Sequence, residues 1–586
     1  MWSTAKSSLV ALTVCLAGLA WSQRTYCNPI NVDYGYCPIP NFVQQGKHRA
    51  TADPVIVTFK GDYYLFSTNQ WGYWWSHDMF HWTFVAHKFL RPDIATLDGN
   101  PIYDELCAPA VWVMGDQLMV IGSTYQKNWP IMASGDPKNN EWHEAIHEFP
   151  VGAWDPAFFL DDDGRLYLYH GSSNAFPIYA WEIDPKTLLP ISERKDLFGV
   201  GTHGWERFGE ANDNTFLKPF IEGAWMTKHG GKYYLQYAAP GTEFSGYGDG
   251  VYVADHPLGP FTYQASNPFS LKPGGFARGA GHGATYQDFN GDWWHVSTIG
   301  ICVKNNFERR IGIWPANFDS DGVLSCDQAY GDYPTYLPDP KQKGFAGWML
   351  LNHNRSVQVS STLGGFAPNY AVDESIKTYW SAKTGNKGEW IETELNEPST
   401  VRAVQINYAD QDAGVMGKVP GLYHQYQLFA SLDGRRWSLI VDKAKNKTDV
   451  PHDYVELEKP VEAKYLKLVN IHMPTGKFAI SGIRAFGRGH GEPPKPVQGF
   501  VALRGTGKDN MGIRENAWLK WAPSDDADGY VVRVGVAPDK LTNSVMVYDA
   551  NEYYWRYMDA DKTYYFQIEA FNQNGISVRS EIQKVE

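Results

Sequence analysis

KGDYYLFST, at residues 60–68, is a turn containing Gly followed by a run rich in aromatic residues. Four later stretches repeat this pattern after an apolar run: MGDQLMVIGST (114–124), DGRLYLYHGS (163–172), GGKYYLQYAA (230–239) and NGDWWHVSTI (290–299). Each reads, with the run before it, as two strands around a tight turn. The turn glycines recur at intervals of 49–67 residues, and a repeated unit of this length is typical of propeller blades. The five units therefore predict a five-bladed β-propeller.

The repeat ends near Pro340, and we assign residues 26–340 to the propeller. Residues 345–488 carry a different alternating pattern, which favours a β-sandwich. The segment EPPKPV, at residues 492–497, is a stiff proline-rich linker. Residues 497–586 suit one more small sandwich. The predicted fold class is all-β, a five-bladed propeller followed by two β-sandwich modules.

Residues 1–22 place one Lys ahead of an apolar stretch from Leu9 to Trp21, which is the pattern of a cleaved secretory signal peptide. No later stretch approaches the ~18 apolar residues that span a bilayer. We expect a secreted or periplasmic protein without a transmembrane segment, and association with the cell surface by other means is compatible with this expectation. In such a compartment Cys27 with Cys37, or Cys302 with Cys326, could form a disulfide.

The 586 residues include 65 acidic and 52 basic side chains, for a net charge of −13. This balance argues against a nucleic-acid partner, whose phosphates need a basic face. The chain is also rich in Trp and Tyr, with 23 and 35 residues. These side chains combine a flat apolar face with a polar edge, which suits β-structure and contact with sugar rings. We expect a monomer with a carbohydrate partner.

Equivalent positions of the five repeats should surround one axis, because the innermost strand of every blade runs along the central channel. Counting back seven to nine residues from each turn glycine gives the start of each inner strand: Asp53, Ala108, Asp155, Glu222 and His282. Three of the five are acidic. Their shared phase brings together carboxylates that are far apart in the sequence.

An Asp-Pro pair is often only a turn starter. Three carboxylates around a narrow channel, however, repel one another and lose hydration, which is costly without a task for them. Such a cluster suits hydrolysis of a glycosidic bond. One carboxylate removes a proton from water while another, kept protonated by its neighbours, donates to the leaving oxygen.

These residues resemble glycoside hydrolase family 43, whose members are five-bladed propellers that invert the anomeric centre. The resemblance covers roughly residues 26–340. It implies that Asp53 in TADP is the general base and Glu222 in IEGAWM the general acid. It further implies that Asp155 in WDPAFF orients the acid and raises its pKa.

The resemblance extends to two further positions. His282 in GAGHGATY is similar to the axial histidine of the family, which holds water or a metal ion beneath the site. Arg309 in ERRIGIWP stands where the family often places a substrate-contacting arginine, although Arg310 lies beside it and a surface ion pair is the alternative. No cofactor is required, and a structural Ca²⁺ at the propeller axis or in the second module is compatible with the resemblance.

Aromatic residues near the inner-strand motifs are candidates for the walls of a sugar pocket. These are Trp154 and Trp225, beside the acidic residues, and Trp71 and Trp74, beyond the first hairpin. Each of them suits the core of a blade as well. An inverting mechanism further predicts that the carboxyls of Asp53 and Glu222 stand roughly 6.5–9.5 Å apart, because the attacking water lies between them.

The second module resembles the discoidin-like, coagulation factor 5/8 C-type sandwich through AVDESIKTYWSA, WIETEL, SLDGRRW and AKYLKLVN. That resemblance implies carbohydrate binding, often with a structural calcium ion. The last module resembles fibronectin type III through Trp521, Tyr530 and the ending EAFNQNGISVRS, which implies a spacer.

The sequence therefore predicts an inverting glycosidase that acts on plant-type polysaccharides, as an α-L-arabinofuranosidase, a β-D-xylosidase or both. That choice of sugar comes from the family resemblance, and galactose-cleaving relatives exist. One alternative is a non-catalytic glycan-binding surface protein, although all three carboxylates are present. Another is a retaining fructan-cleaving propeller, but its Asn-Asp-Pro-Asn motif is replaced here by Ala52-Asp53-Pro54-Val55.

Overall fold

The computed structural model describes residues 24–37, 47–90, 106–124, 129–201, 203–214, 216–506 and 513–586. The predicted signal peptide lies outside these residues. Within them the chain forms strands and three short 3₁₀ turns, η2 (Pro137–Asn139), η3 (Gly204–Glu206) and η4 (Pro368–Ala371). No helix in this part of the chain has the length and apolar character needed to cross a membrane.

Five four-stranded antiparallel sheets follow one another along the chain, each in sequence order from its inner to its outer strand. Blades 1 and 2 are β2 (Val55–Phe59), β3 (Asp62–Phe66), β4 (Gly72–Ser76), β5 (Thr83–Ala86), then β6 (Ala110–Met114), β7 (Gln117–Ile121), β8 (Trp129–Asp136), β9 (Glu141–Phe149). Blades 3 and 4 are β10 (Ala157–Leu160), β11 (Leu166–His170), β12 (Ile178–Ile183), β13 (Lys195–Phe198), then β14 (Glu222–His229), β15 (Lys232–Ala239), β16 (Gly248–Ala254), β17 (Thr262–Tyr263). Blade 5 is β18 (Arg278–Gln287), β19 (Trp293–Gly300), β20 (Arg309–Phe318), β21 (Leu324–Cys326).

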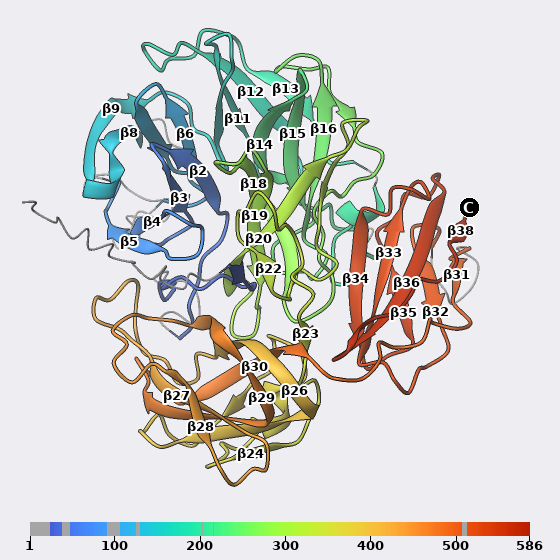
Figure 1. Ribbon diagram of the computed structural model, residues 1–586. Helices are drawn as coiled ribbons and strands as arrows, with labels where there is room; N and C mark the ends of the chain where they lie inside the picture. Colours follow the sequence, from blue (N-terminus) through green and yellow to red (C-terminus); the bar gives the residue numbers. More distant parts are fainter. Residues whose placement is uncertain are drawn as a thin grey trace, which may run out of the picture.

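The inner strands close a ring, because β2 contacts β6, β6 contacts β10, β10 contacts β14, β14 contacts β18 and β18 contacts β2. Figure 1 shows these sheets, from blue to green, grouped around one axis. The five predicted turn glycines, Gly61, Gly115, Gly164, Gly231 and Gly291, all have positive φ. Glycine reaches this conformation without a steric penalty, which explains its recurrence at each hairpin. The five-bladed architecture is confirmed.

The second module is one eight-stranded sheet system. Its strands are β23 (Met349–Leu350), β24 (Val357–Val359), β25 (Trp380–Ser381), β26 (Trp390–Tyr408), β27 (Gln425–Ser431), β28 (Ser438–Asp442), β29 (His452–His472) and β30 (Ala479–Arg488). The short strands β1 (Thr25–Tyr26) and β22 (Thr335–Tyr336) pair beside the propeller.

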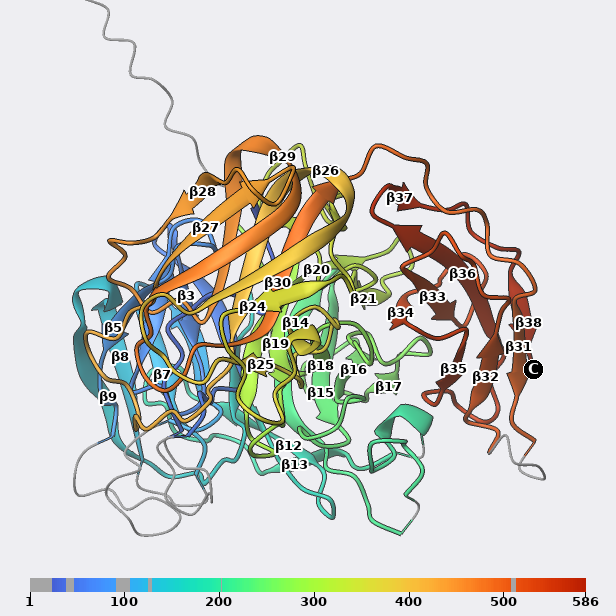
Figure 2. The ribbon, with the colours of Figure 1, turned by 90° about the horizontal axis from the view of Figure 1, so that it is seen from below.

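The last module has a three-stranded and a five-stranded sheet. The first contains β31 (Val501–Arg504), β32 (Ala517–Lys520) and β35 (Glu552–Trp555). The second contains β33 (Gly529–Gly535), β34 (Asn543–Tyr548), β36 (Tyr564–Asn572), β37 (Gly575–Ile576) and β38 (Gln583–Val585). Figure 2 shows both modules beside the propeller.

The three parts share buried contacts. One hydrophobic cluster takes Tyr330 and Tyr333 from the segment after blade 5, Phe486 from β30 and Phe571 from β36. The predicted disulfides of the propeller are absent, because Cys27, Cys37, Cys302 and Cys326 are reduced thiols. Cys27 Sγ instead lies 2.9 Å from the carbonyl oxygen of Asp332. The disulfide prediction was wrong for both pairs.

Arg49 is a buried charge between the propeller and the second module. Its guanidinium donates to both oxygens of Asp449 at 2.6 and 3.0 Å and lies 3.5 Å from Asp410. Replacing Arg49 with Met leaves the buried Asp449 without its guanidinium partner, whereas Asp410 keeps its ion pair with Arg310. We expect this to cost ~3–5 kcal/mol of unfolding free energy. Thermal unfolding should show the loss, whereas Arg436→Met, at a side chain 93% exposed, should change little. Equal melting temperatures for the two variants would contradict this role.

Candidate active site

The five blades start with the same backbone conformation. Asp53, Ala108, Asp155, Gly223 and His282 have φ of 52°, 40°, 50°, 63° and 50°. Each lies two residues before the regular pairing of its inner hairpin, which begins at Val55, Ala110, Ala157, Trp225 and Ala284. Left-handed backbone at non-glycine residues costs roughly 1 kcal/mol or more each and is concentrated at functional sites. The repeat therefore builds five equivalent turns at one end of the ring.

The predicted phase was wrong by one residue in blade 4. Gly223, not Glu222, stands in the position equivalent to Asp53 and Asp155, and Glu222 precedes it at a bulge. The reason is steric, since a Cβ on Gly223 would lie 2.7 Å from the ring of His282. Glu222 consequently approaches the site from a different backbone position than the other two carboxylates.

His282 joins two of the predicted residues. Its Nδ1 lies 3.2 Å from Asp53 Oδ1 and 3.8 Å from Asp155 Oδ2. Arg309 NH1 lies 3.8 Å from Asp53 Oδ1. The structure therefore brings together Asp53, Asp155, His282 and Arg309, and each is largely buried.

Glu222 is held by two hydroxyl groups that the sequence analysis missed. Ser172 Oγ donates to Oε2 at 2.8 Å, and the Tyr247 hydroxyl donates to Oε1 at 2.6 Å. Burial raises the pKa of Tyr247 well above its ordinary value, so this hydroxyl keeps its proton. Ser172 comes from blade 3 and Tyr247 precedes β16 of blade 4, so the carboxyl is fixed between two blades.

Hydroxyl groups also link successive blades. Thr68 Oγ1 accepts from the Ala108 N–H at 2.8 Å and donates to Asp53 Oδ2 at 2.5 Å. Ser123 Oγ accepts from the Asp155 N–H at 2.9 Å, and Thr298 Oγ1 accepts from the Asp53 N–H at 3.0 Å. A sequence signal existed for these residues, because a Ser-Thr pair stands at or next to the end of three of the five repeated stretches, in FST, GST and VST.

Asp249 and His295 support the backbone of His282. Asp249 Oδ1 accepts from the His282 N–H at 2.8 Å, and Asp249 Oδ2 lies 2.9 Å from His295 Nε2. His295 Nδ1 in turn lies 3.0 Å from Thr285 Oγ1. This buried chain fixes the position from which the His282 ring reaches Asp53 and Asp155.

Two charge states at the centre of the site are shifted. Burial, the largest influence, raises the pKa of Asp155 to about 7, with His282 opposing the rise and Glu222 and Asp53 adding to it. Burial alone would lower the pKa of His282, but Asp53, Asp155 and Glu222 outweigh it and raise that pKa. The raised pKa favours the protonated form of the ring between these carboxylates. No cluster of three or more metal-ligating side chains occurs among the described residues. A role of His282 as a metal ligand stays a prediction.

Asp155 should make stability depend on pH. A carboxyl has a pKa near 3.9 when unfolded, so its raised value in the folded protein favours folding at low pH. This contribution is lost as the pH rises from about 4 to about 7. We expect Asp155→Asn to stabilise the protein by ~1–3 kcal/mol at pH 8 and by less at pH 4. Thermal unfolding of both proteins at the two pH values measures this, and a pH-independent difference would contradict it.

The two adjacent arginines have separate tasks, and neither makes a surface ion pair. Arg309 faces the site and donates from NH1 to Thr242 Oγ1 at 3.0 Å. Arg310 faces the second module, where its guanidinium lies 2.9 Å from His452 Nε2 and 3.3 Å from Asp410 Oδ2. Both are buried, at 8% and 2% exposure. Successive side chains of β20 point to opposite sides, which explains the division.

The tryptophan predictions have different outcomes. The prediction that Trp74 is a sugar platform was wrong, because its side chain is 0% exposed and donates from Nε1 to Asp33 Oδ1 at 2.6 Å. Trp225 is half-buried, with its Nε1 donating to the Thr285 carbonyl at 2.9 Å. Trp154 is half-buried directly before Asp155. A sugar contact for Trp154 or Trp225 stays a prediction.

Gly223 offers a test of the packing beneath the site. Gly223→Ala combines a left-handed backbone with a Cβ against the His282 ring, so we expect a loss of ~1–3 kcal/mol and lower kcat/KM. Gly164→Ala is a matched control, because Gly164 also has positive φ but nothing within 4 Å of its Cβ position. The control should lose only about 1 kcal/mol from strain and keep its activity. Unchanged activity in Gly223→Ala would count against the packing argument.

The fold and site define a class, a five-bladed propeller with a buried acidic site where its inner strands begin. Residues 41–324 match the model of glycosyl hydrolases family 43, and residues 356–483 match the F5/8 type C domain. The propeller thus matches the family 43 model, and the second module matches the F5/8 type C model.

Three curated relatives are similar over part of their length. A beta-xylosidase of Xylanibacter ruminicola is 34% identical over 19% of this chain and 39% of its own. An arabinoxylan arabinofuranohydrolase of Paenibacillus polymyxa is 33% identical over 25% of this chain and 23% of its own. The beta-D-galactofuranosidase xynD of Aspergillus niger is 30% identical over 29% of this chain and 48% of its own. The chain spans less than half the length of each of them.

A solved structure of a family 43 protein from Bacillus licheniformis covers 93% of this chain and 100% of its own, with 15% identity and a TM-score of 0.41.

Proposed function

We propose that the protein is an inverting glycoside hydrolase. The observation that carries the proposal is the meeting of Asp53, Asp155 and Glu222 with His282 at the start of the inner strands. Three carboxyls in a buried site cost free energy through repulsion and lost hydration. Acid and base catalysis at a glycosidic bond uses both the cluster and its shifted pKa values.

Asp53 acts as the general base. Thr68 donates to one of its oxygens, and His282 and Arg309 face the other, which holds the carboxyl in one orientation. In the reaction a water gives its proton to Asp53 and attacks the anomeric carbon from the face opposite the leaving group.

Glu222 acts as the general acid and protonates the departing oxygen. Its hydrogen bonds to Ser172 and Tyr247 hold the carboxyl at the edge of the site. Asp155 orients the acid, since its Oδ2 accepts the N–H of Gly223, the residue after Glu222, at 3.3 Å. We keep the prediction that the Asp53 and Glu222 carboxyls stand roughly 6.5–9.5 Å apart.

We propose that the substrates are plant polysaccharides or oligosaccharides with terminal α-L-arabinofuranose or β-D-xylose. The names of the Xylanibacter and Paenibacillus relatives support this choice. A galactose-containing substrate is the second candidate, favoured by the name of the Aspergillus relative.

The test is to incubate the protein with aryl arabinofuranoside, xyloside and galactofuranoside and to follow the released anomer by NMR. We expect release with inverted configuration from one of them. Retention would favour the fructan-type propeller mechanism. Absence of release from all three, with glycan binding intact, would favour a non-catalytic glycan-binding protein.

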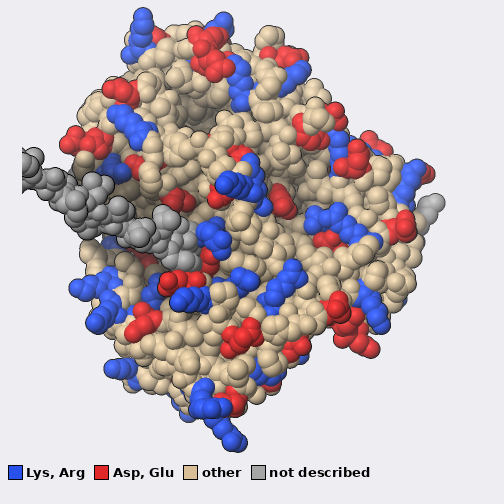
Figure 3. Space-filling model, in the orientation of Figure 1, with Lys and Arg blue, Asp and Glu red and all other residues tan. Residues whose placement is uncertain are grey.

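We propose that the F5/8 type C module binds carbohydrate and that the last module is a fibronectin type III spacer. The separate three-stranded and five-stranded sheets of the last module support the second assignment. Secretion after removal of residues 1–22 and a monomeric state belong to the same proposal. Figure 3 shows basic and acidic side chains interspersed on one face of the molecule, which agrees with a partner other than nucleic acid.

A further inference from the structure

A groove of about 920 Å³ lies between blade 1 and the F5/8 type C module. Its walls come from residues 31–36, from residues 71–88 and from the module segments 417–422 and 443–455. The outermost strand of blade 1, β5, forms one wall, whereas the carboxylates stand at the inner strands. The groove is thus separate from the active site, and its volume is in the range of small-ligand sites.

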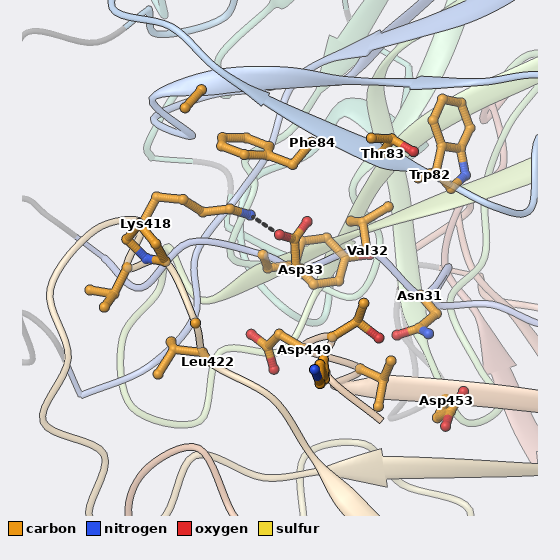
Figure 4. Close-up of a pocket in the computed structure, with 18 of the residues that line it drawn as sticks. Asn31, Val32, Asp33, Trp82, Thr83, Phe84, Lys418, Leu422, Asp449 and Asp453 are labelled. Carbon is orange, nitrogen blue, oxygen red and sulfur yellow. Dashed lines mark ion pairs between the residues drawn. The ribbon is translucent and has the colours of Figure 1, made fainter. Parts of the chain in front are cut away.

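Aromatic side chains form the propeller wall of the groove. Trp82 and Phe84 of the β5 hairpin are half-buried, and Figure 4 shows Phe84 beside Lys418 of the module. Lys418 Nζ lies 4.0 Å from the centre of the Phe84 ring, so Trp82 offers the more open ring. Trp71 lies at the end of this wall, where its ring packs against Gly417 of the module. Flat rings that are partly open to a groove suit stacking against sugar rings.

The groove has ring nitrogens without hydrogen-bond partners. Trp71 Nε1, a donor, and His87 Nε2, whose role depends on the tautomer of the ring, are buried and have no hydrogen-bond partner among the described residues. They belong to one end of blade 1, because the His87 N–H donates to the Trp71 carbonyl at 3.1 Å. Buried ring nitrogens of this kind cost free energy until a hydrogen-bond partner arrives. A ligand rich in hydroxyl groups would satisfy them.

The carboxylates that line the groove are already held by protein groups. Asp33 lies 3.1 Å from Lys418 Nζ, Asp449 accepts twice from Arg49, and Asp453 accepts from the Tyr426 hydroxyl at 2.8 Å. Figure 4 shows the Lys418 to Asp33 pair spanning the groove. These acids therefore have little capacity left to bind a cation or a donor.

Two lysines of the groove, Lys88 and Lys447, are exposed, and no carboxylate lies in ion-pair contact with either among the described residues. Lys88 Nζ stands 5.1 Å from the centre of the Trp71 ring, so one charge and one orphan donor lie close together. The groove thus presents positive charge and donors within a chain of net charge −13.

We propose that this groove binds a polysaccharide segment that carries a uronic acid. A sugar ring stacks on Trp82, the sugar hydroxyl groups accept from Trp71 Nε1 and form a hydrogen bond with His87 Nε2, and the uronate carboxylate faces Lys88 and Lys447. The site goes beyond the proposed hydrolysis, because no reacting group lies in the groove. It would hold an acidic chain on the enzyme while the carboxylates act elsewhere on the same polymer.

The test uses the full chain carrying Glu222→Gln, so that bound glycan is not hydrolysed. Calorimetric titration compares a xylo-oligosaccharide bearing glucuronic acid with the neutral oligosaccharide of the same length. We expect the acidic probe to bind about five- to tenfold more tightly, with the advantage shrinking as salt is raised. Equal affinity for the two probes would overturn the proposal.

Variants locate the binding. Lys88→Gln with Lys447→Gln should remove the preference for the acidic probe, and Trp71→Phe should weaken both probes. Lys445→Gln is the matched control, since Lys445 is exposed two residues from Lys447 but does not line the groove. An acidic preference that survives the double lysine variant would place the site elsewhere and contradict the proposal. Turnover of an aryl glycoside by the double variant with Glu222 intact should stay unchanged, which separates failure of the groove from failure of the hydrolase assignment.

Discussion

Glu222→Gln is expected to lower kcat on a natural oligosaccharide by about 10²–10⁴-fold. The amide is nearly the same size as the carboxyl, and its one oxygen can still accept from Tyr247, while its NH2 group can donate to the Ser172 hydroxyl. It cannot deliver a proton to the leaving oxygen. The fold should remain, so circular dichroism and the melting temperature should match the parent protein.

The leaving group separates a lost acid from a damaged site. An aryl glycoside with a strongly acidic phenol departs without protonation, so Glu222→Gln should retain much of its activity on that substrate. The exposed Glu193→Gln is the control and should behave as the parent on both substrates. An equal loss on activated and natural substrates would show that Glu222 is not the acid.

Asp53→Asn is expected to lower kcat by about 10²–10⁴-fold on every substrate, whatever its leaving group. The attacking water then has no base, and good leaving groups cannot replace it. Thr68 can still donate to the amide oxygen, but His282 and Arg309 lose the charge that they face. Steady-state kinetics over a series of aryl glycosides measures both the loss and its independence from the phenol.

The exposed Asp196→Asn serves as the control for Asp53→Asn. Activity near that of the parent would remove Asp53 from the mechanism. A loss that disappeared with good leaving groups would instead assign Asp53 the role given to Glu222.

The five-fold architecture was predictable because each blade carries its own local signal. A hairpin turn requires positive φ, and Gly61, Gly115, Gly164, Gly231 and Gly291 supply it in every repeat. The approach of Asp53, Asp155 and His282 then followed from geometry, since equivalent positions of a closed ring must face one axis.

The errors came from contacts that no single repeat encodes. Glu222 is one residue out of phase because Gly223 must pass beneath His282, a contact between blades 4 and 5. Trp74 is buried because Asp33, from the segment before blade 1, accepts from its indole nitrogen. The neighbours Arg309 and Arg310 could be separated only once the second module stood against one side of β20.

The hydroxyl links between blades have a consequence for how this protein can be recombined. Thr68 accepts from the Ala108 N–H at the start of blade 2, and Ser123 accepts from the Asp155 N–H at the start of blade 3. Thr298 accepts from the Asp53 N–H where blade 5 meets blade 1. The four-stranded unit that repeats along the chain is thus offset from the unit that these hydrogen bonds join. A transplant of blade 3 alone would separate Asp155 from Ser123, whereas crossovers at the hairpin turns of Gly115 and Gly164 would transfer the two together.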